Sequence, residues 1–156
     1  MTFKEAVAAT PHLENAWKPG LQALRAEDRP HIEAEDTRKL QGSADVDTAL
    51  QQIQPNANRW DFVIAYQHTD RTDEVIYWTE PHTASDSEVK VVIRKAQWLL
   101  GWLRTGGNPL NAFEREIIWV SSGATTFTLT SPQKKHMAAA GLAHVGLKLR
   151  IPNTRG

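Results

Sequence analysis

The stretch WDFVIAYQHTDRTDEVIYWTEPHTASDSEVKVVIRK, residues 60–95, contains the clearest structural pattern in the chain. Two segments within it, WDFVIAY (60–66) and EVIYWTE (74–80), are rich in β-branched and aromatic residues, and the polar segment QHTDRTD separates them. This composition is typical of strands and of the turn between them. Residues 60–80 are therefore predicted to form a β-hairpin.

Two acidic residues lie near the open end of this hairpin. With the turn centred on Asp70 and Arg71, Asp61 falls opposite Glu80 or within one residue of it. Side chains alternate between the two faces of a sheet, so we expect Asp61, Glu80 and His82 on the same face. Both faces are otherwise largely apolar, which favours a sheet covered on both sides by helices.

A long amphipathic helix is predicted directly after the hairpin. Ser85 and Glu88 have the spacing of a capping box. Apolar residues then recur at the spacing of one helix face, namely Val89, Val92, Ile93, Ala96, Leu99, Leu100 and Leu103. A second stripe on the same helix consists of Val91, Lys95, Trp98 and Trp102. The second stripe needs a cover, either from the N-terminal part of the chain, with Trp17 as a contact, or from a second copy in a homodimer.

The remaining sequence predicts a single domain over residues 1–156, with a helical part at 1–30 and an α/β core at 31–152. Further helices are expected at 3–9, at 13–24 with a break near Pro19, after a cap at Asp47, and from a cap at Ser131 to about Ala140. Further strands are expected at 31–36, in an extended run to about Val46, at 116–122, and at 144–152. This order predicts an α/β sandwich with a central mixed sheet.

The composition excludes several classes of protein. The chain has no cysteine, which rules out disulfides, thiolate zinc sites and a catalytic cysteine. It has no apolar run of membrane-spanning length, and its start, MTFKEAVAAT, lacks the apolar core of a signal peptide, so we expect a cytoplasmic protein that does not contact a membrane. The formal net charge of zero argues against a strongly basic nucleic-acid-binding surface.

The acidic pair suggests a metal site. Magnesium prefers oxygen ligands and is often held by one or two carboxylates from rigid elements. Asp61 and Glu80 are therefore candidate ligands of Mg²⁺ or Mn²⁺, and such an ion can activate water and stabilise charge on a phosphoryl group. In the alternative interpretation, Asp61 is a strand-end acid that faces solvent or pairs with Arg59 or Lys95.

These residues resemble the PD-(D/E)xK restriction-endonuclease-like superfamily. A helix and a strand precede a strand that begins with Asp61 in RWDFVI, a returning strand carries Glu80 in WTEPH, and a helix follows. The resemblance implies that Asp61 and Glu80 are the motif acids. Where the family has a lysine two residues after the second acid, this chain has His82. Some members carry the lysine on the following helix, where this chain has Lys95 and, as a second choice, Lys90.

The resemblance also implies a fold and an activity. It covers residues 32–151 in topology, and an upstream acid often completes such sites, with the candidates here being Glu33, Glu35, Asp45 and Asp47. The implied activity is magnesium-dependent hydrolysis of nucleic acid, in which His82 or Lys95 positions or deprotonates the attacking water. The alternative is a catalytically inactive member that acts as a binding or assembly module through Trp98 and Trp102.

Overall fold

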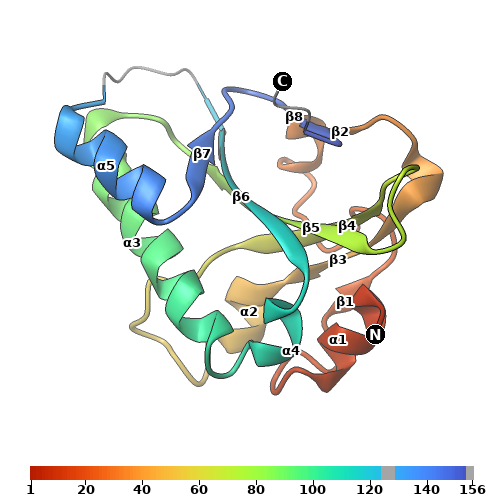
Figure 1. The fold of residues 1–156 in the computed structure, drawn as a ribbon. Coiled ribbons are helices and arrows are strands. Elements are labelled where there is room, and N and C mark those ends of the chain that lie inside the picture. Colours follow the sequence, from red (N-terminus) through yellow and green to blue (C-terminus); the bar gives the residue numbers. More distant parts are fainter. Residues whose placement is uncertain (124–128, 154–156) are drawn as a thin grey trace.

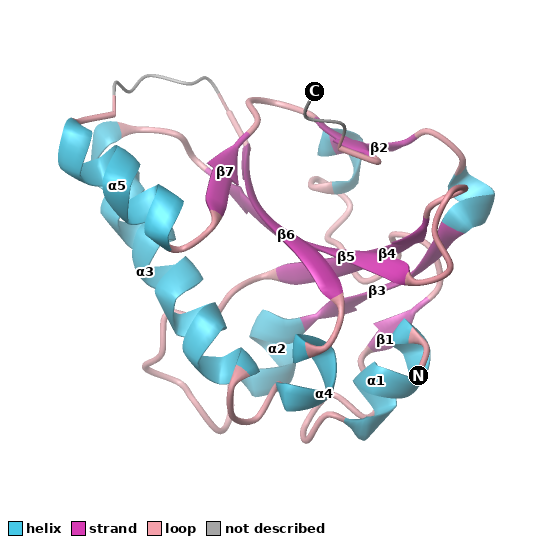
Figure 2. Ribbon diagram, in the orientation of Figure 1, coloured by secondary structure: helices cyan, strands magenta, loops and turns pink. Residues whose placement is uncertain are grey.

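The computed structural model describes residues 1–123 and 129–153. Within these residues, six strands form one mixed sheet in the order β1-β3-β4-β5-β6-β7 (Figures 1 and 2). The strands are β1 (Trp17–Lys18), β3 (Leu40–Asp45), β4 (Phe62–Gln67), β5 (Glu74–His82), β6 (Glu114–Ser121) and β7 (Leu142–His144). Neighbours from β1 to β5 are antiparallel, whereas β6 runs parallel to both β5 and β7. The predicted α/β class with a central mixed sheet is confirmed.

Helices cover one face of this sheet. They are α1 (Phe3–Ala9), α2 (Val46–Leu50), α3 (Asp86–Leu103), α4 (Asn108–Asn111) and α5 (Ser131–Ala139). Their buried residues form one apolar cluster with Val63 and Ala65 of β4 and with Ile76 and Trp78 of β5. The predicted apolar face of α3 is buried in this cluster, apart from the half-buried Leu100. In Figure 1, α3 and α5 lie next to each other at one end of the sheet.

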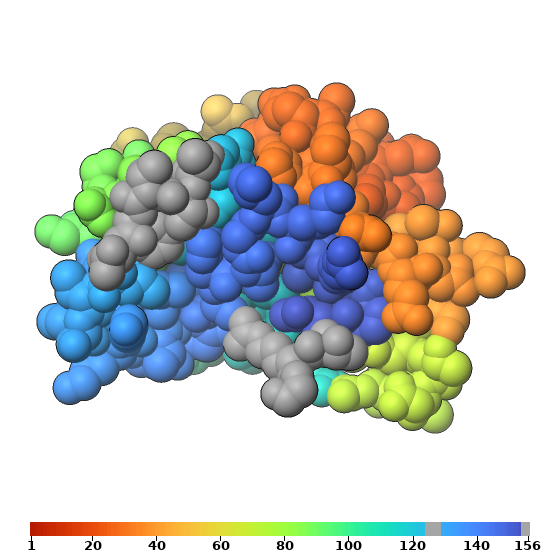
Figure 3. Space-filling view, turned by 90° about the horizontal axis from the view of Figure 1, so that it is seen from above, coloured from red at the N-terminus to blue at the C-terminus, as the bar shows by residue number. Residues whose placement is uncertain are grey.

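Among residues 1–123 and 129–153, the other face is covered without α-helices, so the prediction of helices on both sides is wrong. Its apolar residues on β4 and β5, including Phe62 and Tyr77, pack against Leu24 and against two short strands, β2 (Ile32–Ala34) and β8 (Leu149–Ile151). These two strands pair in parallel, and Figure 3 shows the N-terminal and C-terminal parts of the chain side by side on this surface. Two 3₁₀ turns, η1 (Arg29–His31) and η2 (Thr37–Lys39), flank β2. Pro19 and Pro30 bound the stretch that precedes β2, and Pro152 follows β8, so no long helix runs through these positions.

The helix predicted over residues 13–24 is also absent from the structure of this segment. The segment forms turns around β1, which pairs with β3. The indole Nε1 of Trp17 donates to the carbonyl oxygen of Gln41 at 3.0 Å. Gly42 permits this contact, because its φ is +111° and a Cβ atom there would lie 2.1 Å from the indole nitrogen. Long-range packing of Trp17 therefore outweighs the local helical pattern.

The hairpin has the predicted register. Phe62 pairs with Thr79, so the ladder extended by one residue places Asp61 opposite Glu80. The helix after it begins as predicted at Asp86, but the capping box is not formed: the Ser85 side chain makes no capping bond, and Glu88 binds His82 instead.

Other element ends differ by a residue or more from the prediction. Asp45, not Asp47, caps α2, and Thr130, not Ser131, caps α5 through a capping box with Gln133. In both helices the side chain one or two positions earlier reaches the free backbone N–H groups. The single strand predicted over 144–152 is divided into β7 and β8, with Gly146 at a φ of +79° between them.

Candidate active site

The two predicted acids lie together, buried at the open end of the hairpin. The backbone N–H of Asp61 donates to Oε1 of Glu80 at 3.1 Å. Asp61 is 6% exposed and Glu80 is fully buried. Buried carboxylates are costly unless they are paired or hydrogen-bonded. The partners of these two acids therefore determine what the site can do.

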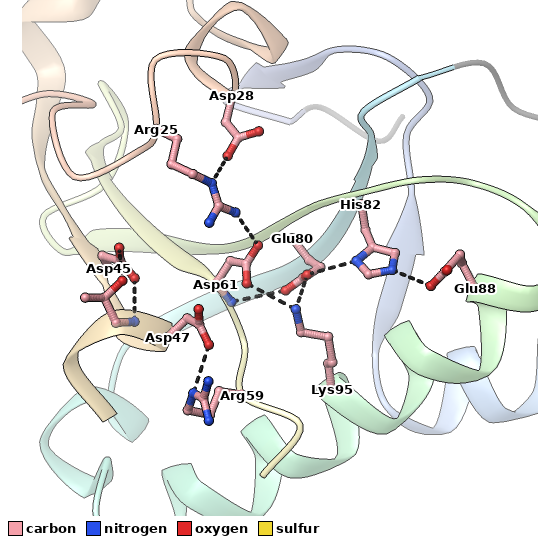
Figure 4. Close-up of polar contacts among 11 residues, drawn as sticks. Arg25, Asp28, Asp45, Asp47, Arg59, Asp61, Glu80, His82, Glu88 and Lys95 are labelled. Carbon is pink, nitrogen blue, oxygen red and sulfur yellow. Dashed lines mark hydrogen bonds and ion pairs between the residues drawn. The ribbon is translucent and has the colours of Figure 1, made fainter. Parts of the chain in front are cut away.

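Lys95 of α3 is the central partner. Its Nζ lies 3.1 Å from Oδ1 of Asp61 and also donates a closer hydrogen bond to Oε2 of Glu80 (Figure 4). The Lys95 side chain is only 13% exposed. Burial alone would lower its pKa, but the charges of Glu80 and Asp61 outweigh that effect and raise it. The structure thus unites Asp61, Glu80 and Lys95, whereas Arg59 pairs with Asp47 at 2.9 Å.

His82 extends the cluster toward the start of α3. Its Nδ1 lies 3.4 Å from Oε2 of Glu80, and its Nε2 lies 2.7 Å from Oε2 of Glu88. The hydrogen bond to Glu80 raises the pKa of His82, burial opposes this, and Glu88 adds to the rise. An imidazole between two carboxylates is stabilised as the cation, in which both nitrogens donate. These contacts therefore favour the protonated form of His82 over the neutral one.

Burial controls the charge of Glu80. It raises the pKa of this carboxyl to about 7, and the negative charge of Asp61 acts in the same direction. The hydrogen bond from His82 and the charge of Lys95 oppose the rise. A carboxyl whose pKa lies near neutrality is a common feature of functional sites, although ion-pair networks produce it as well.

Arg25 joins the site from the other side. Its Nη2 lies 3.2 Å from Oδ2 of Asp61, and its Nε lies 3.0 Å from Oδ2 of Asp28 (Figure 4). Arg25 and Asp28 belong to the segment between β1 and η1. Sequence reasoning missed both residues, because an ion pair across 36 positions leaves no local pattern.

The four upstream acids do not form a third ligand in this arrangement. Asp45 caps α2 through Thr48, and burial raises its pKa, with Asp47 and Asp61 adding their charges. Glu33 lies 3.8 Å from both Lys148 and Arg150. The backbone N–H of Glu35 donates to the Ile151 carbonyl, beside β8. Over residues 1–123 and 129–153, no group of three or more His, Cys, Asp or Glu side chains has the arrangement of a metal site.

The tryptophan stripe of α3 is largely covered by its own chain. Trp102 is 5% exposed, with its ring stacked 5.7 Å from that of Trp98 and edge-on to Trp78 at 6.0 Å. The indole Nε1 of Trp98 donates to Oε1 of Gln54 at 3.0 Å. Trp17, the predicted cover, instead lies beneath the ammonium group of Lys4. Half-buried Trp98 remains as the candidate contact for a second copy.

No family model, curated protein or solved structure matches this chain. The described parts of the chain contain no helix with both the length and the apolar character needed to span a membrane. What the site does must therefore be inferred from its own residues and from the order of the elements around it.

Proposed function

We propose that this protein is a metal-dependent nuclease of the restriction-endonuclease-like type, which hydrolyses phosphodiester bonds in nucleic acid. The observation that supports this proposal best is the convergence of Asp61, Glu80 and Lys95 from a hairpin and the helix that follows it. Two acids and a lysine are the residue types that the PD-(D/E)xK motif combines.

The order and direction of the elements agree with the same proposal. Helix α1 and strand β3 precede the β4–β5 hairpin, β3 to β5 are antiparallel, and α3 leads to β6, which runs parallel to β5. Asp61 adjoins the start of β4, and Glu80 lies near the end of β5. The lysine comes from α3, as in those superfamily members that carry it on the helix.

The donor set is compatible with Mg²⁺ or Mn²⁺. Two carboxylates on adjacent strands offer hard oxygen ligands, and magnesium usually takes its remaining ligands from water and substrate phosphate. Lys95 forms ion pairs with both carboxylates in the present arrangement, so we expect metal binding to compete with these ion pairs. When bound, such an ion would activate water and stabilise negative charge on phosphate.

The side chains around the acids have distinct roles in this proposal. Asp61 and Glu80 would hold the ion, and the Lys95 ammonium group is a donor that can orient the attacking water. The hydrogen bond to Glu80 raises the pKa of His82, which favours a role for His82 in supporting Glu80 or donating a proton. Glu88 keeps the His82 ring in place through its 2.7 Å contact.

The test begins with isothermal titration of magnesium and manganese into the wild type and Asp61→Asn. Cleavage of single- and double-stranded DNA and RNA is then measured for the wild type, Asp61→Asn, Glu80→Gln and Lys95→Met. We expect each substitution to lower cleavage about 100-fold or more. Asp47→Asn is the matched control, because Asp47 is a neighbouring acid paired only with Arg59 in the described contacts. A folded wild type that cleaves nothing with either metal would refute the proposal.

A catalytically inactive binding or assembly module is the second candidate. Two observations favour it: Lys95 and Arg25 already pair with the acids, and His82 stands where the motif has lysine. In this interpretation, the ion pairs of Asp61 and Glu80 have a purely structural role and stabilise the open end of the hairpin. This candidate predicts no metal binding and a surface contact through Trp98.

A further inference from the structure

Arg25 lies at the edge of the candidate active site, where it can reach both the site and solvent. Its side chain is 49% exposed, whereas that of Lys95, the other cation on Asp61, is 13% exposed. In Figure 4 the two cations approach the Asp61 carboxylate from opposite sides. Arg25 can therefore leave Asp61 with less rearrangement than Lys95.

Contacts other than Asp61 hold Arg25 in position. Its Nε donates to the Asp28 carboxylate at 3.0 Å, and the Asp28 side chain is only 8% exposed. The backbone N–H of Asp28 in turn donates to the Arg25 carbonyl oxygen at 2.9 Å. The guanidinium group also lies over the Phe62 ring, 5.3 Å from its centre. Asp28 and Phe62 thus keep the guanidinium beside the acids even when its bond to Asp61 is broken.

Of the two cations on Asp61, Arg25 is the one that a second anion can reach from solvent. Because the Arg25 guanidinium is 49% exposed, solvent screens its attraction to Asp61 more than that of Lys95, whose side chain is 13% exposed. A divalent cation on Asp61 would weaken the attraction to Arg25 further, since it supplies positive charge to the same carboxylate. The released N–H donors of a guanidinium match the oxygens of a phosphate group.

We infer that Arg25 is a phosphate-contacting residue of this site, and that its bond to Asp61 is the substrate-free state of that contact. This inference rests on the proposed nuclease function. The ligand class is the phosphodiester backbone of a nucleic acid, because the phosphate under attack must lie next to Asp61 if Asp61 holds the ion. Asp28 is then the positioning residue for Arg25.

The experiment compares wild type, Arg25→Gln and Arg25→Lys with Arg29→Gln as the matched control. Arg29 lies in the same segment, but its guanidinium donates to the backbone carbonyls of Leu24 and Gln22. The kcat and KM of Mg²⁺-dependent cleavage are measured for each protein. Binding of a short labelled DNA duplex, with Ca²⁺ in place of Mg²⁺, is measured over a range of salt concentrations.

We expect Arg25→Gln to raise KM about 10-fold and to reduce the slope of log affinity against log salt by about one, as for the loss of one phosphate contact. Arg25→Lys should restore the slope but not the full kcat/KM, because an ammonium group cannot bind phosphate in the bidentate manner. If the role of Arg25 were purely structural, its substitution would alter the stability of the protein without changing the slope of log affinity against log salt.

Two outcomes separate this inference from the function on which it rests. If the wild type cleaves and both Arg25 variants keep its kcat, KM and salt slope, the assignment of Arg25 is overturned while the nuclease proposal stands. If the wild type neither cleaves nor binds the duplex, both fail together. Arg25→Lys keeps the test valid should Arg25→Gln fold poorly, because it preserves the charge facing Asp61 and Asp28.

Discussion

At the scale of single residues, Lys95 is the cation that both buried carboxylates share. Removing one partner of a buried ion pair leaves an uncompensated charge, at a cost of about 3–5 kcal/mol. We expect Lys95→Met to lower the free energy of unfolding by this amount, as measured by chemical denaturation. Lys90→Met is the control, because Lys90 is an exposed residue of the same helix, and its loss should cost within about 0.5 kcal/mol.

A double substitution tests whether the pair acts as a unit. Combining Lys95→Met with Glu80→Gln removes the ammonium group and one of the charges it neutralises, so the combined loss should be smaller than the sum of the single losses. Additive losses would show that Lys95 and Glu80 contribute to stability independently. That result would contradict a stabilising role for the hydrogen bond between them.

The sequence identifies some residues of the site and not others, for a physical reason. Asp61 and Glu80 follow from the strand pattern, because alternation and the turn centre together determine which residues face each other. The helical pattern places Lys95 on the helix after the hairpin, but the direction of its side chain depends on how α3 packs on the sheet. Arg25 comes from a segment whose conformation depends on distant contacts, so no local pattern reveals it.

At the scale of elements, prediction succeeded where local pattern and tertiary packing agree. The hairpin and α3 have strong periodicity, and both form as predicted. Residues 13–24 have a helical pattern, but the contacts of Trp17 with β3 produce a short strand and turns instead. The 144–152 segment is divided because Gly146 adopts positive φ. Elements that cover the second face of the sheet are determined by what they pack against, which the sequence alone does not show.

Two glycines near the end of α3 should respond oppositely to alanine. A Cβ on Gly107 would lie 2.6 Å from the Trp102 ring, so Gly107→Ala should lower stability by about 1–3 kcal/mol through overpacking. A Cβ on Gly101, within the helix, meets nothing within 4 Å, and Gly101→Ala should raise stability by about 0.5–1 kcal/mol. Thermal unfolding of both variants checks this, and equal shifts would contradict the tight packing around Trp102.

At the scale of the whole molecule, we predict a homodimer whose interface contains Trp98. Trp102 is buried against its own chain, so substituting it would test folding rather than assembly. We expect the wild type to elute as a dimer and Trp98→Ala as a folded monomer, measured by size-exclusion chromatography with light scattering. Gln97→Ala is the control, as Gln97 is the exposed neighbour. A monomeric wild type would end this prediction.

The buried cluster also makes the stability of the whole molecule depend on pH. The pKa of Glu80 is about 7 in the folded chain against an ordinary value of 4.5, so between these values the folded chain binds more protons than the unfolded chain. Stability should therefore fall as pH rises through this window, by at most about 3 kcal/mol. The pKa of His82 is also raised, so the stability that His82 contributes is present below 6.5 and is lost as pH rises through its folded value.

Glu80→Gln separates this effect from the rest of the titration. The amide cannot ionise, and it replaces the carboxylate that raises the pKa of His82 with a neutral acceptor, so the free energy of unfolding should vary less with pH than in the wild type. Chemical denaturation from about pH 5 to pH 8 gives both profiles, and their slopes rather than their levels are compared, because the substitution also weakens the Lys95 contact. Parallel profiles would mean that Glu80 ionises at an ordinary pKa. The acid would then already be fully charged when the protein meets a metal ion at neutral pH, and cation binding would release no proton from it.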